Sequence, residues 1–237
     1  FGVGADGFVV MKKLAAAKYE WSFFNSDGSF AAMCGNAARA AASFLGEAKW
    51  PVELKTGFGL VKLEALVPSE FRVEIDYSKK RLQELALAKP SSDSGVAIGT
   101  TVLIDTGVPH VVMETAVDVL SLKSGSVERS LAAPFRWPKE AGAAGANVTF
   151  FRRTGAKAIE AVTFERGVED YTLSCGTGVL AAAVVASRAL QAGQWSQEIT
   201  VKNPGGVLRV DSKNFPSSLL LTGPAHTVFR TEFEFDV

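Results

Sequence analysis

The stretch MCGNAARAAASFL, residues 33–45, contains one of the two cysteines in a chain of 237 residues, and the other lies in LSCGTGVLAAAVVA, residues 173–186. Each cysteine is followed by glycine, a small polar residue and an alanine-rich apolar run with helical spacing. A glycine stands one or two positions past each run, where helices commonly end. The sequence therefore predicts helices over residues 36–45 and 177–191, each starting directly after a Cys-Gly pair.

The surroundings of the two cysteines repeat in the same order, about 140 residues apart. Each copy runs from a strand through a polar loop to Cys-Gly, a helix, a second strand, a glycine turn and a third strand. Because this period is far too long for a solenoid repeat, it indicates a duplicated domain. We expect an α+β fold of two pseudo-symmetric domains, each a mostly antiparallel sheet or barrel wrapped around a central helix. The first domain is predicted over 1–92, completed by 227–237, and the second over 93–226, with 87–100 as the connection.

Charge and composition narrow the class of partner. The 25 Lys and Arg residues balance the 25 Asp and Glu residues, and no basic run suggests binding to nucleic acid or to an anionic membrane. No stretch approaches the roughly 20 apolar residues that cross a bilayer. Two cysteines so far apart form neither a disulfide framework nor a local Cys-x-x-Cys metal or redox site. We expect a soluble protein, by default cytoplasmic, that binds a small molecule and has no nucleic-acid or membrane partner.

The position of the cysteines predicts a chemistry. If the halves pack with pseudo-twofold symmetry, the two helix starts face each other across a cleft between the domains. A thiol at a helix N-terminus lies near unpaired N–H groups, which can lower its pKa from about 8.5. Two opposed thiols can remove a proton from one face of a carbon and deliver another to the opposite face, while the N–H groups hold a carboxylate. This arrangement indicates racemisation or epimerisation of an α-amino acid by two bases.

At these residues the chain resembles a known family. NSDGSFAAMCGNAAR and ERGVEDYTLSCGTG are similar to the two cysteine motifs of the diaminopimelate epimerase family, and GVGADG, GVPH, GANVTFF, NPGG and LTGPA extend the resemblance over nearly the whole chain. The resemblance implies an isomerase that needs no pyridoxal phosphate, other cofactor or metal. Such an enzyme interconverts LL- and meso-diaminopimelate in lysine and peptidoglycan precursor synthesis. It implies a small amino acid as the binding partner and leaves a homodimer open.

The resemblance also implies a role for particular residues. Cys34 and Cys175 would be the two acid/base groups. Glu165 would bind the α-ammonium group of the substrate, and Arg166 would pair with its distal carboxylate. His110 would support the site by orienting Glu165 or other polar groups. The remaining residues would bind substrate, the first four through backbone amides at the α-carboxylate and the last two at the distal end: Gly35, Asn36, Gly176, Thr177, Asn25 and Asn147.

The sequence departs from the family in four places. The chain opens in FGVGADGFVV, without the usual first strand and without Met, so we expect an upstream segment to be absent. Val108 stands where the family usually has Asn before Pro-His, Ala37 replaces a glycine, and Tyr171 replaces a common acidic residue. The first two departures leave the substrate open. The alternatives are a cofactor-independent racemase of another amino acid and a non-catalytic relative that binds a small molecule.

Four residues near the motifs have ordinary structural interpretations. Asp27 lies in Asn-Ser-Asp-Gly, which favours a turn, so we expect it to form that turn rather than to act on substrate. Glu165 and Arg166 could form an exposed ion pair of little energetic consequence. Arg39 is expected to point along the surface of the first helix. Finally, two thiols that lie close together could oxidise to a disulfide.

Overall fold

The computed structural model describes residues 4–46, 50–78, 84–87, 98–122, 131–188 and 198–232, and nearly half of them lie in strands. The strands are β1 Gly7–Ala15, β2 Lys18–Asn25, β3 Phe30–Ala31, β4 Val52–Lys55, β5 Leu60–Val67, β6 Glu70–Asp76, β7 Glu84–Ala86, β8 Ile98–Asp105, β9 Pro109–Thr115, β10 Asn147–Gly155, β11 Ala158–Glu165, β12 Asp170–Thr172, β13 Glu198–Asn203, β14 Gly206–Asp211 and β15 Ser218–Pro224. The helices are α1 Gly35–Leu45 and α3 Gly176–Arg188, with short 3-10 turns η1 Val119–Ser121, η2 Ala133–Phe135 and η3 Lys139–Ala141.

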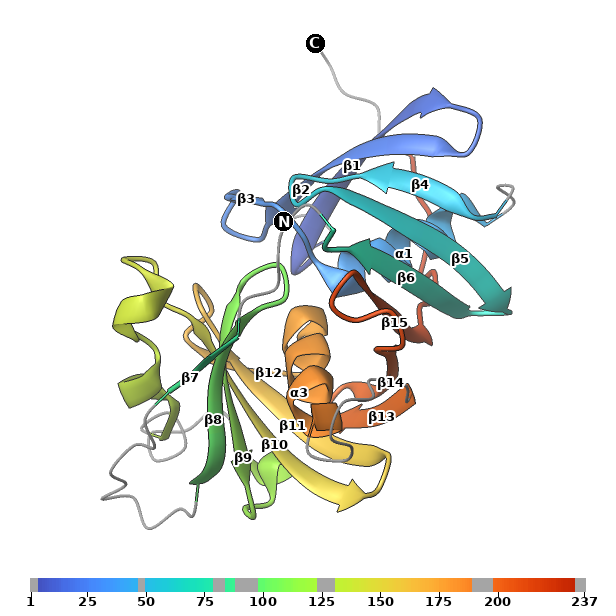
Figure 1. Cartoon of the computed structure of the whole chain (residues 1–237). Helices are drawn as coiled ribbons and strands as arrows, with labels where there is room; N and C mark the ends of the chain where they lie inside the picture. Colours follow the sequence, from blue (N-terminus) through green and yellow to red (C-terminus); the bar gives the residue numbers. More distant parts are fainter. Residues whose placement is uncertain are drawn as a thin grey trace.

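The strands form one continuous, strongly curved sheet. Its order is β1-β2-β4-β5-β6-β15-β14-β13-β11-β10-β9-β8-β7, with β3 beside β2 and β12 beside β11. The strands β1 to β6 form one half of the molecule, and β7 to β14 form the other (Figure 1). Strand β15 joins the halves because it pairs antiparallel with both β6 and β14.

The halves are built alike, as the repeated sequence order predicts. In the first half β1 and β2 form a hairpin, β2 runs parallel to β4, and β4 and β5 form a second hairpin. In the second half β10 with β11, β11 with β13, and β13 with β14 repeat these three relationships. Even the register shift near the first hairpin turn recurs, between Lys13 and Ala15 and between Arg153 and Gly155. The expected α+β fold of two sheet-rich, pseudo-symmetric halves is confirmed.

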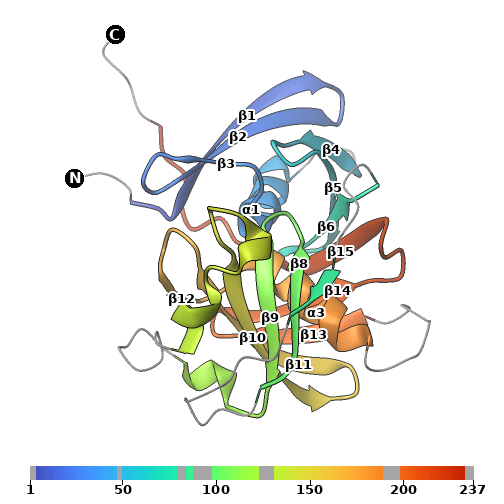
Figure 2. The same cartoon turned by 60° about the vertical axis from the view of Figure 1, so that its left-hand side comes forward.

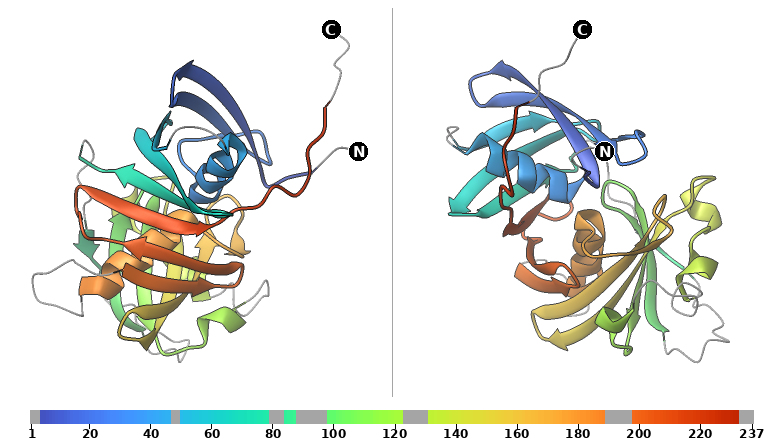
Figure 3. Two further views of the ribbon diagram at one scale, coloured as in Figure 1. Left: turned by 90° about the vertical axis from the view of Figure 1, so that its right-hand side faces the viewer. Right: turned by 180° about the vertical axis from the view of Figure 1, so that it is seen from behind.

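Each half curves around one helix, and alanine makes this arrangement fit. Alanine has the highest helix propensity and a side chain small enough to let a strand approach the helix closely. Helix α1 buries one face, with Ala38 and Ala42 fully covered, against β5 and β6. Helix α3 is buried on all sides over residues 176–187 and packs against β9, β10 and β11. The rear view in Figure 3 shows both helices within their curved sheets.

A second apolar cluster covers the outer face of the second half. It combines side chains of β9, β10 and β11, such as Val111, Phe150 and Val162, with Val119 and Leu122 from the segment that contains η1. Figure 2 shows the segment with η1, η2 and η3 along this side of the strands. The outer layer keeps β10 and β11 covered on both faces, so the ends of these strands hold their side chains in fixed positions.

The predicted elements agree closely with those observed. Both helices start one residue before the predicted position, at Gly35 and Gly176. Most of the predicted connection, at 88–97, and the end of the predicted helix 177–191 lie outside the described residues, so the domain boundaries stay a prediction. Within the described part of the chain, every helix is too short or too polar to cross a membrane.

Candidate active site

The two cysteines stand at matching positions, one residue before α1 and α3. Cys34 has extended backbone angles (φ −145°, ψ 119°) and caps α1, with its sulfur accepting the N–H of Ala37 at 3.5 Å. The carbonyl of Cys34 accepts the N–H of Ala38 at 3.0 Å, and the carbonyl of Cys175 accepts that of Val179 at 2.9 Å. Both cysteines are free thiols. The duplicated Cys-Gly-helix pattern therefore has a duplicated structure.

The helix starts touch each other through glycine. A methyl group added to Gly35 would lie 3.1 Å from the Cα of Gly176 and 3.0 Å from a methyl carbon of Leu221. One added to Gly176 would lie 2.9 Å from the Cα of Gly35. Since these separations are shorter than normal carbon contacts, only glycine permits this approach. The glycine after each cysteine thus brings the N-termini of α1 and α3 together from opposite halves.

The thiols are more basic than the sequence suggests. Burial raises the pKa of Cys34, an effect that outweighs hydrogen bonds from the N–H groups of Ala37 and Asn36. Burial also raises the pKa of Cys175 far above its usual range, and the charge of Glu165 raises it further. Our expectation that the helix N-termini lower both pKa values is therefore wrong. A few N–H dipoles do not compensate for removing a thiolate from water.

Glu165 lies beside Cys175 at the end of β11. Its carboxylate accepts a hydrogen bond from the hydroxyl of Thr172 and another from the Cys175 thiol. Burial raises the pKa of Glu165 despite these two bonds. Its neighbour Arg166 is turned elsewhere and donates Nη1 to the Gly145 carbonyl at 3.3 Å. The interpretation of Glu165 and Arg166 as an exposed ion pair is therefore wrong, because each binds other groups and both are partly buried.

His110 forms the centre of a buried polar cluster behind Cys175. Its Nδ1 lies 2.9 Å from the hydroxyl of Thr149, and its Nε2 lies 2.9 Å from the hydroxyl of Thr177 and 3.3 Å from Nδ2 of Asn147. Burial, and then the charge of Arg166, lower the pKa of His110 from 6.5 to about 3, so the ring is neutral. His110 therefore contacts two predicted substrate-binding residues, Asn147 and Thr177.

The orientation of the Asn147 amide determines which groups donate and which accept in this cluster. Its Oδ1 accepts the backbone N–H of Arg166 at 2.7 Å, so its Nδ2 faces His110 as a donor. Nε2 of His110 must then accept, and the ring proton lies on Nδ1. The Thr177 hydroxyl lies 2.9 Å from Nε2 and 3.4 Å from the Cys175 sulfur, so it connects the ring to the thiol. The cluster thus ends on one of the two cysteines.

Asn25 occupies the position in the first half that Glu165 occupies in the second. Both residues end the strand that leads to the cysteine loop, since β2 pairs with β3 as β11 pairs with β12. The amide of Asn25 is exposed and donates to the hydroxyl of Ser29 at 2.9 Å. Asp27 accepts the N–H of Ser29 at 2.8 Å, which confirms that it forms the turn.

Two side chains near Cys34 make contacts that the sequence does not predict. Arg39 does not point along the helix surface: it is only 6% exposed, and its guanidinium group folds back to the carbonyl of Gly35 at 3.3 Å. The prediction failed because the sequence does not show that β15 covers this side of α1. The side-chain amide of Asn36 reaches the other half of the molecule, where it donates to the carbonyl of Ser174 at 2.9 Å. No signal in the sequence marked either contact except an isolated cation within an alanine run.

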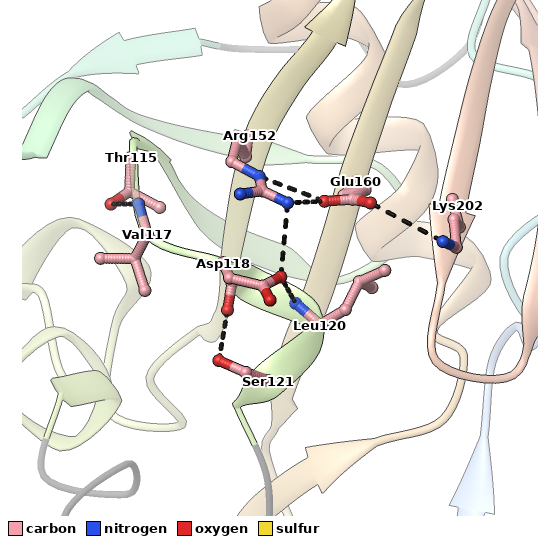
Figure 4. Close-up of polar contacts among 8 residues, drawn as sticks. All are labelled: Thr115, Val117, Asp118, Leu120, Ser121, Arg152, Glu160 and Lys202. Atoms are coloured by element: carbon pink, nitrogen blue, oxygen red, sulfur yellow. Dashed lines mark hydrogen bonds and ion pairs between the residues drawn. The ribbon is translucent and has the colours of Figure 1, made fainter.

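A separate cavity of about 510 Å³ lies on the surface of the second half, lined in part by Glu114, Arg152 and Arg153. None of the predicted site residues lines it. Arg153 pairs with Glu114 at 2.7 Å. Figure 4 shows Arg152 paired with Glu160 and Asp118. Because these charges compensate one another, the cavity does not present a binding site of one sign.

Comparisons with known proteins agree on the family. The sequence profile described as diaminopimelate epimerase matches residues 1–76 and 102–228. The diaminopimelate epimerase of Aquifex aeolicus is 32% identical over 256 aligned residues, which cover 100% of this chain and 82% of the relative. That of Archaeoglobus fulgidus is 34% identical over 238 residues, which cover 97% of this chain and 80% of the relative.

Solved structures share the fold at low sequence identity. A predicted epimerase from Pseudomonas aeruginosa superposes with a TM-score of 0.67 at 15% identity, covering 98% of this chain and 85% of the other. A hydroxyproline epimerase from Agrobacterium vitis, with bound trans-4-hydroxy-L-proline, gives a TM-score of 0.61 at 18% identity, covering 92% of this chain and 71% of the other. These likenesses support the two-half fold described above.

Proposed function

Since this chain belongs to the diaminopimelate epimerase family, we propose that it interconverts LL- and meso-diaminopimelate by proton transfer between two cysteines and the α-carbon. The observation that carries the proposal is the contact between the two helix starts, which puts Cys34 and Cys175 at equivalent positions on opposite halves. Such a site suits a reaction that inverts one carbon, because the carbon must exchange a proton on both faces.

The proposed reaction conserves protons at every step. One cysteine, as thiolate, removes the α-proton and becomes a thiol. The electron pair left on the α-carbon spreads into the neighbouring carboxylate, which accepts hydrogen bonds from the backbone N–H groups of Gly35, Asn36, Gly176 and Thr177. The other cysteine, as thiol, then protonates the opposite face and becomes the thiolate. The enzyme ends with its charge unchanged and its cysteine roles exchanged.

The raised pKa values of both thiols fit this scheme in one respect. A thiolate with a raised pKa accepts a proton more readily, although less of it exists at the operating pH, near which the pKa of a catalytic base is best placed. A buried thiolate is therefore a stronger base than an exposed one. The α-ammonium group of the substrate would add a positive charge beside Glu165, and this charge would favour ionisation of a neighbouring thiol.

Deuterium exchange tests this function directly. The purified protein in D2O, without added cofactor, should convert LL-diaminopimelate to the meso form and incorporate deuterium at the inverted carbon. Cys34→Ala and Cys175→Ala should each abolish conversion while the chain stays folded, because the substitution leaves little cavity. Wild-type conversion rates in either variant would show that the replaced cysteine is not a base.

A second candidate is a racemase of another amino acid, and Val108 favours it. Gly107, which precedes Val108, lies against Thr177, so this loop borders the proposed site. A valine there cannot supply the hydrogen bonds of the asparagine usual in the family. Turnover of lysine or glutamate at rates comparable with that of diaminopimelate would establish this alternative.

Arg166 offers a finer test of the substrate. Its planar guanidinium group suits two parallel hydrogen bonds with a distal carboxylate. Arg166→Lys should weaken use of diaminopimelate, and Arg166→Met should weaken it more, by about 2 to 5 kcal/mol of transition-state binding. Turnover of lysine, which lacks the distal carboxylate, should change little. Equal losses on both substrates would instead make Arg166 structural.

The proposal also includes a cytoplasmic location and assembly as a homodimer. Cell fractionation tests the first. Sedimentation of the purified protein at several concentrations tests the second.

A further inference from the structure

Asn36 connects the two cysteine loops by a hydrogen bond between residues 138 positions apart. Its Nδ2 donates to the carbonyl of Ser174, the residue directly before Cys175, at 2.9 Å. Its Oδ1 accepts Nη2 of Arg39 at 2.8 Å. Because Arg39 has only donors, it binds the oxygen of the amide and turns the nitrogen toward Ser174. Arg39 therefore determines which way the Asn36 amide points.

Arg39 is an unusual residue for this position. It is 6% exposed within an alanine-rich helix, although a fully buried cation is rare without a charged partner. Its guanidinium group also donates to the carbonyls of Gly35 at 3.3 Å and Pro224 at 3.4 Å, and among the described residues none of its three acceptors carries a full charge. Burial lowers the pKa of Arg39 to about 10, so it stays charged at neutral pH. Fold stability alone gives no reason to keep such a group, since an apolar residue of similar volume would avoid its desolvation.

The groups that accept hydrogen bonds from Arg39 indicate why a buried cation lies at this position. Pro224 ends β15, the strand that joins the two halves, and Gly35 starts α1. Through Asn36 the same group acts on the loop that leads to Cys175. One buried side chain thus ties together the segments that carry Cys34, the joining strand and, indirectly, Cys175.

We propose that Arg39 and Asn36 form a clasp that holds the Cys34 helix start against the Ser174–Cys175 loop and so sets the spacing of the two cysteine sulfurs. Both are positioning residues, because they act through the cysteine loops. The glycine contact between Gly35 and Gly176 allows the close approach, and the clasp prevents the two helix starts from sliding past each other. The catalytic consequence rests on the function proposed above, whereas the spacing itself does not.

Asn36→Asp breaks the hydrogen bond to Ser174 and keeps a partner for the buried Arg39. The aspartate can still accept Nη2 of Arg39, now with a compensating charge, so the chain should fold. It cannot donate to Ser174 and would place a negative oxygen against that carbonyl. Arg39→Lys is the companion variant, because an ammonium group cannot bind three separated acceptors as the planar fork does. Arg72→Met is the matched control, since Arg72 bonds Glu64 on the neighbouring strand and neither cysteine loop.

A thiol reagent that fluoresces only when it joins two thiols measures the spacing without any turnover. The chain has only two cysteines, so the signal can arise within one molecule in only one way. We expect the wild type and Arg72→Met to be cross-linked at equal rates, and Asn36→Asp and Arg39→Lys to be cross-linked severalfold more slowly. Labelling of single cysteines by a monofunctional analogue should change less. Equal cross-linking in all four proteins, or none in the wild type, would overturn the clasp.

Kinetics provide the second readout. Misplacing a catalytic group by about 1 Å can lower turnover on the order of 100-fold. We expect Asn36→Asp and Arg39→Lys to lower kcat for diaminopimelate about 10- to 100-fold. KM should stay nearly unchanged in Arg39→Lys, which adds no charge beside the substrate carboxylate, and the unfolding midpoint of Asn36→Asp should stay close to that of Arg72→Met. An unchanged kcat would show that the cysteine spacing does not depend on the clasp. If the wild type does not epimerise at all, the proposed function fails, and the cross-linking rates still decide on the clasp.

Discussion

Ala37 and Gly178 occupy the same position, three residues after Cys34 and Cys175, yet the side chain that fits at the first has no room at the second. A methyl group on Gly178 would collide with the hydroxyl of Thr163 and lie 3.1 Å from that of Thr149. Ala37 carries a methyl group at this position and is buried within α1. The two halves are therefore equivalent in backbone and different in what lies beneath the helix start.

Gly178→Ala should lower both stability and activity. Overpacking a filled core costs typically about 1–3 kcal/mol, and here the strain falls on threonines that bind His110 and one another. Chemical denaturation and epimerisation assays measure the two effects. Ala37→Gly is the matched control and should cost about 0.5–1 kcal/mol through helix propensity, and about 0.8 kcal/mol more for the buried methyl group that it removes. Equal effects of the two substitutions would show that the cluster adapts to the extra methyl group.

Glu160→Gln should destabilise the second half and leave catalysis unchanged. The side chain of Glu160 is 11% exposed and binds Arg152 on β10, with Lys202 on β13 at 3.8 Å, as seen in Figure 4. Losing the charge leaves Arg152 with a weaker partner, which should lower the free energy of unfolding by about 1–3 kcal/mol.

The matched control for this change is Glu20→Gln, which disrupts the exposed pair with Lys55. Because water screens exposed pairs, this variant should unfold at nearly the wild-type denaturant midpoint. A loss of kcat in Glu160→Gln with normal stability would instead connect the outer ion pairs to the site.

His110 should make the fold sensitive to acid. Its pKa is about 3 in the folded protein and 6.5 in the unfolded chain. Below pH 6.5 the unfolded chain therefore takes up a proton that the folded chain does not. The stability from the neutral ring is fully present above pH 6.5 and is lost as the pH falls toward 3, with a slope approaching about 1.4 kcal/mol per pH unit.

His110→Gln should remove that slope, so the free energies of unfolding of wild type and variant should converge as the pH falls from 6.5 to 4. His226→Gln, which changes the only other histidine, an exposed one, should keep the wild-type slope. Parallel curves for wild type and His110→Gln would mean that the ring is protonated in the folded protein.

The features predicted correctly from the sequence are those that depend on local pattern or on repetition. Cys-Gly followed by alanine predicts both helix starts to within one residue, because glycine and apolar spacing act over a few positions. The repeated order predicts the two halves. The turn at Asp27 follows from composition in the same way.

Properties that depend on burial could not be predicted. The dipole argument at Cys34 and Cys175 considers only the helix, whereas the surrounding strands remove water and reverse the direction of the pKa shift. Arg39 illustrates the same difficulty: the strand that covers it lies 185 positions away in the sequence. Tyr171, a departure from the family pattern, packs edge-on against Phe164 with the ring centroids 5.5 Å apart. Only the folded sheet reveals this contact.

The charge of Glu165 should control the reactivity of Cys175. After burial, the Glu165 carboxylate is the next cause that raises the pKa of Cys175, whereas for Cys34 it ranks behind burial and two backbone hydrogen bonds. Glu165→Gln keeps the shape and removes the charge, so the pKa of Cys175 should fall and more thiolate should exist at any given pH. The pH curve for alkylation by iodoacetamide should move to lower pH, by up to about tenfold in rate at fixed pH for each pKa unit. Mass analysis of the two cysteine peptides over time measures each rate separately, and the rate at Cys175 should increase more than the rate at Cys34.

Glu169→Gln is the control, because this exposed carboxylate in the same loop binds Arg136 and should leave both rates unchanged. Unchanged or slower alkylation of Cys175 in Glu165→Gln would mean that burial alone keeps this thiol protonated, and that Glu165 influences the reaction only through the substrate it binds.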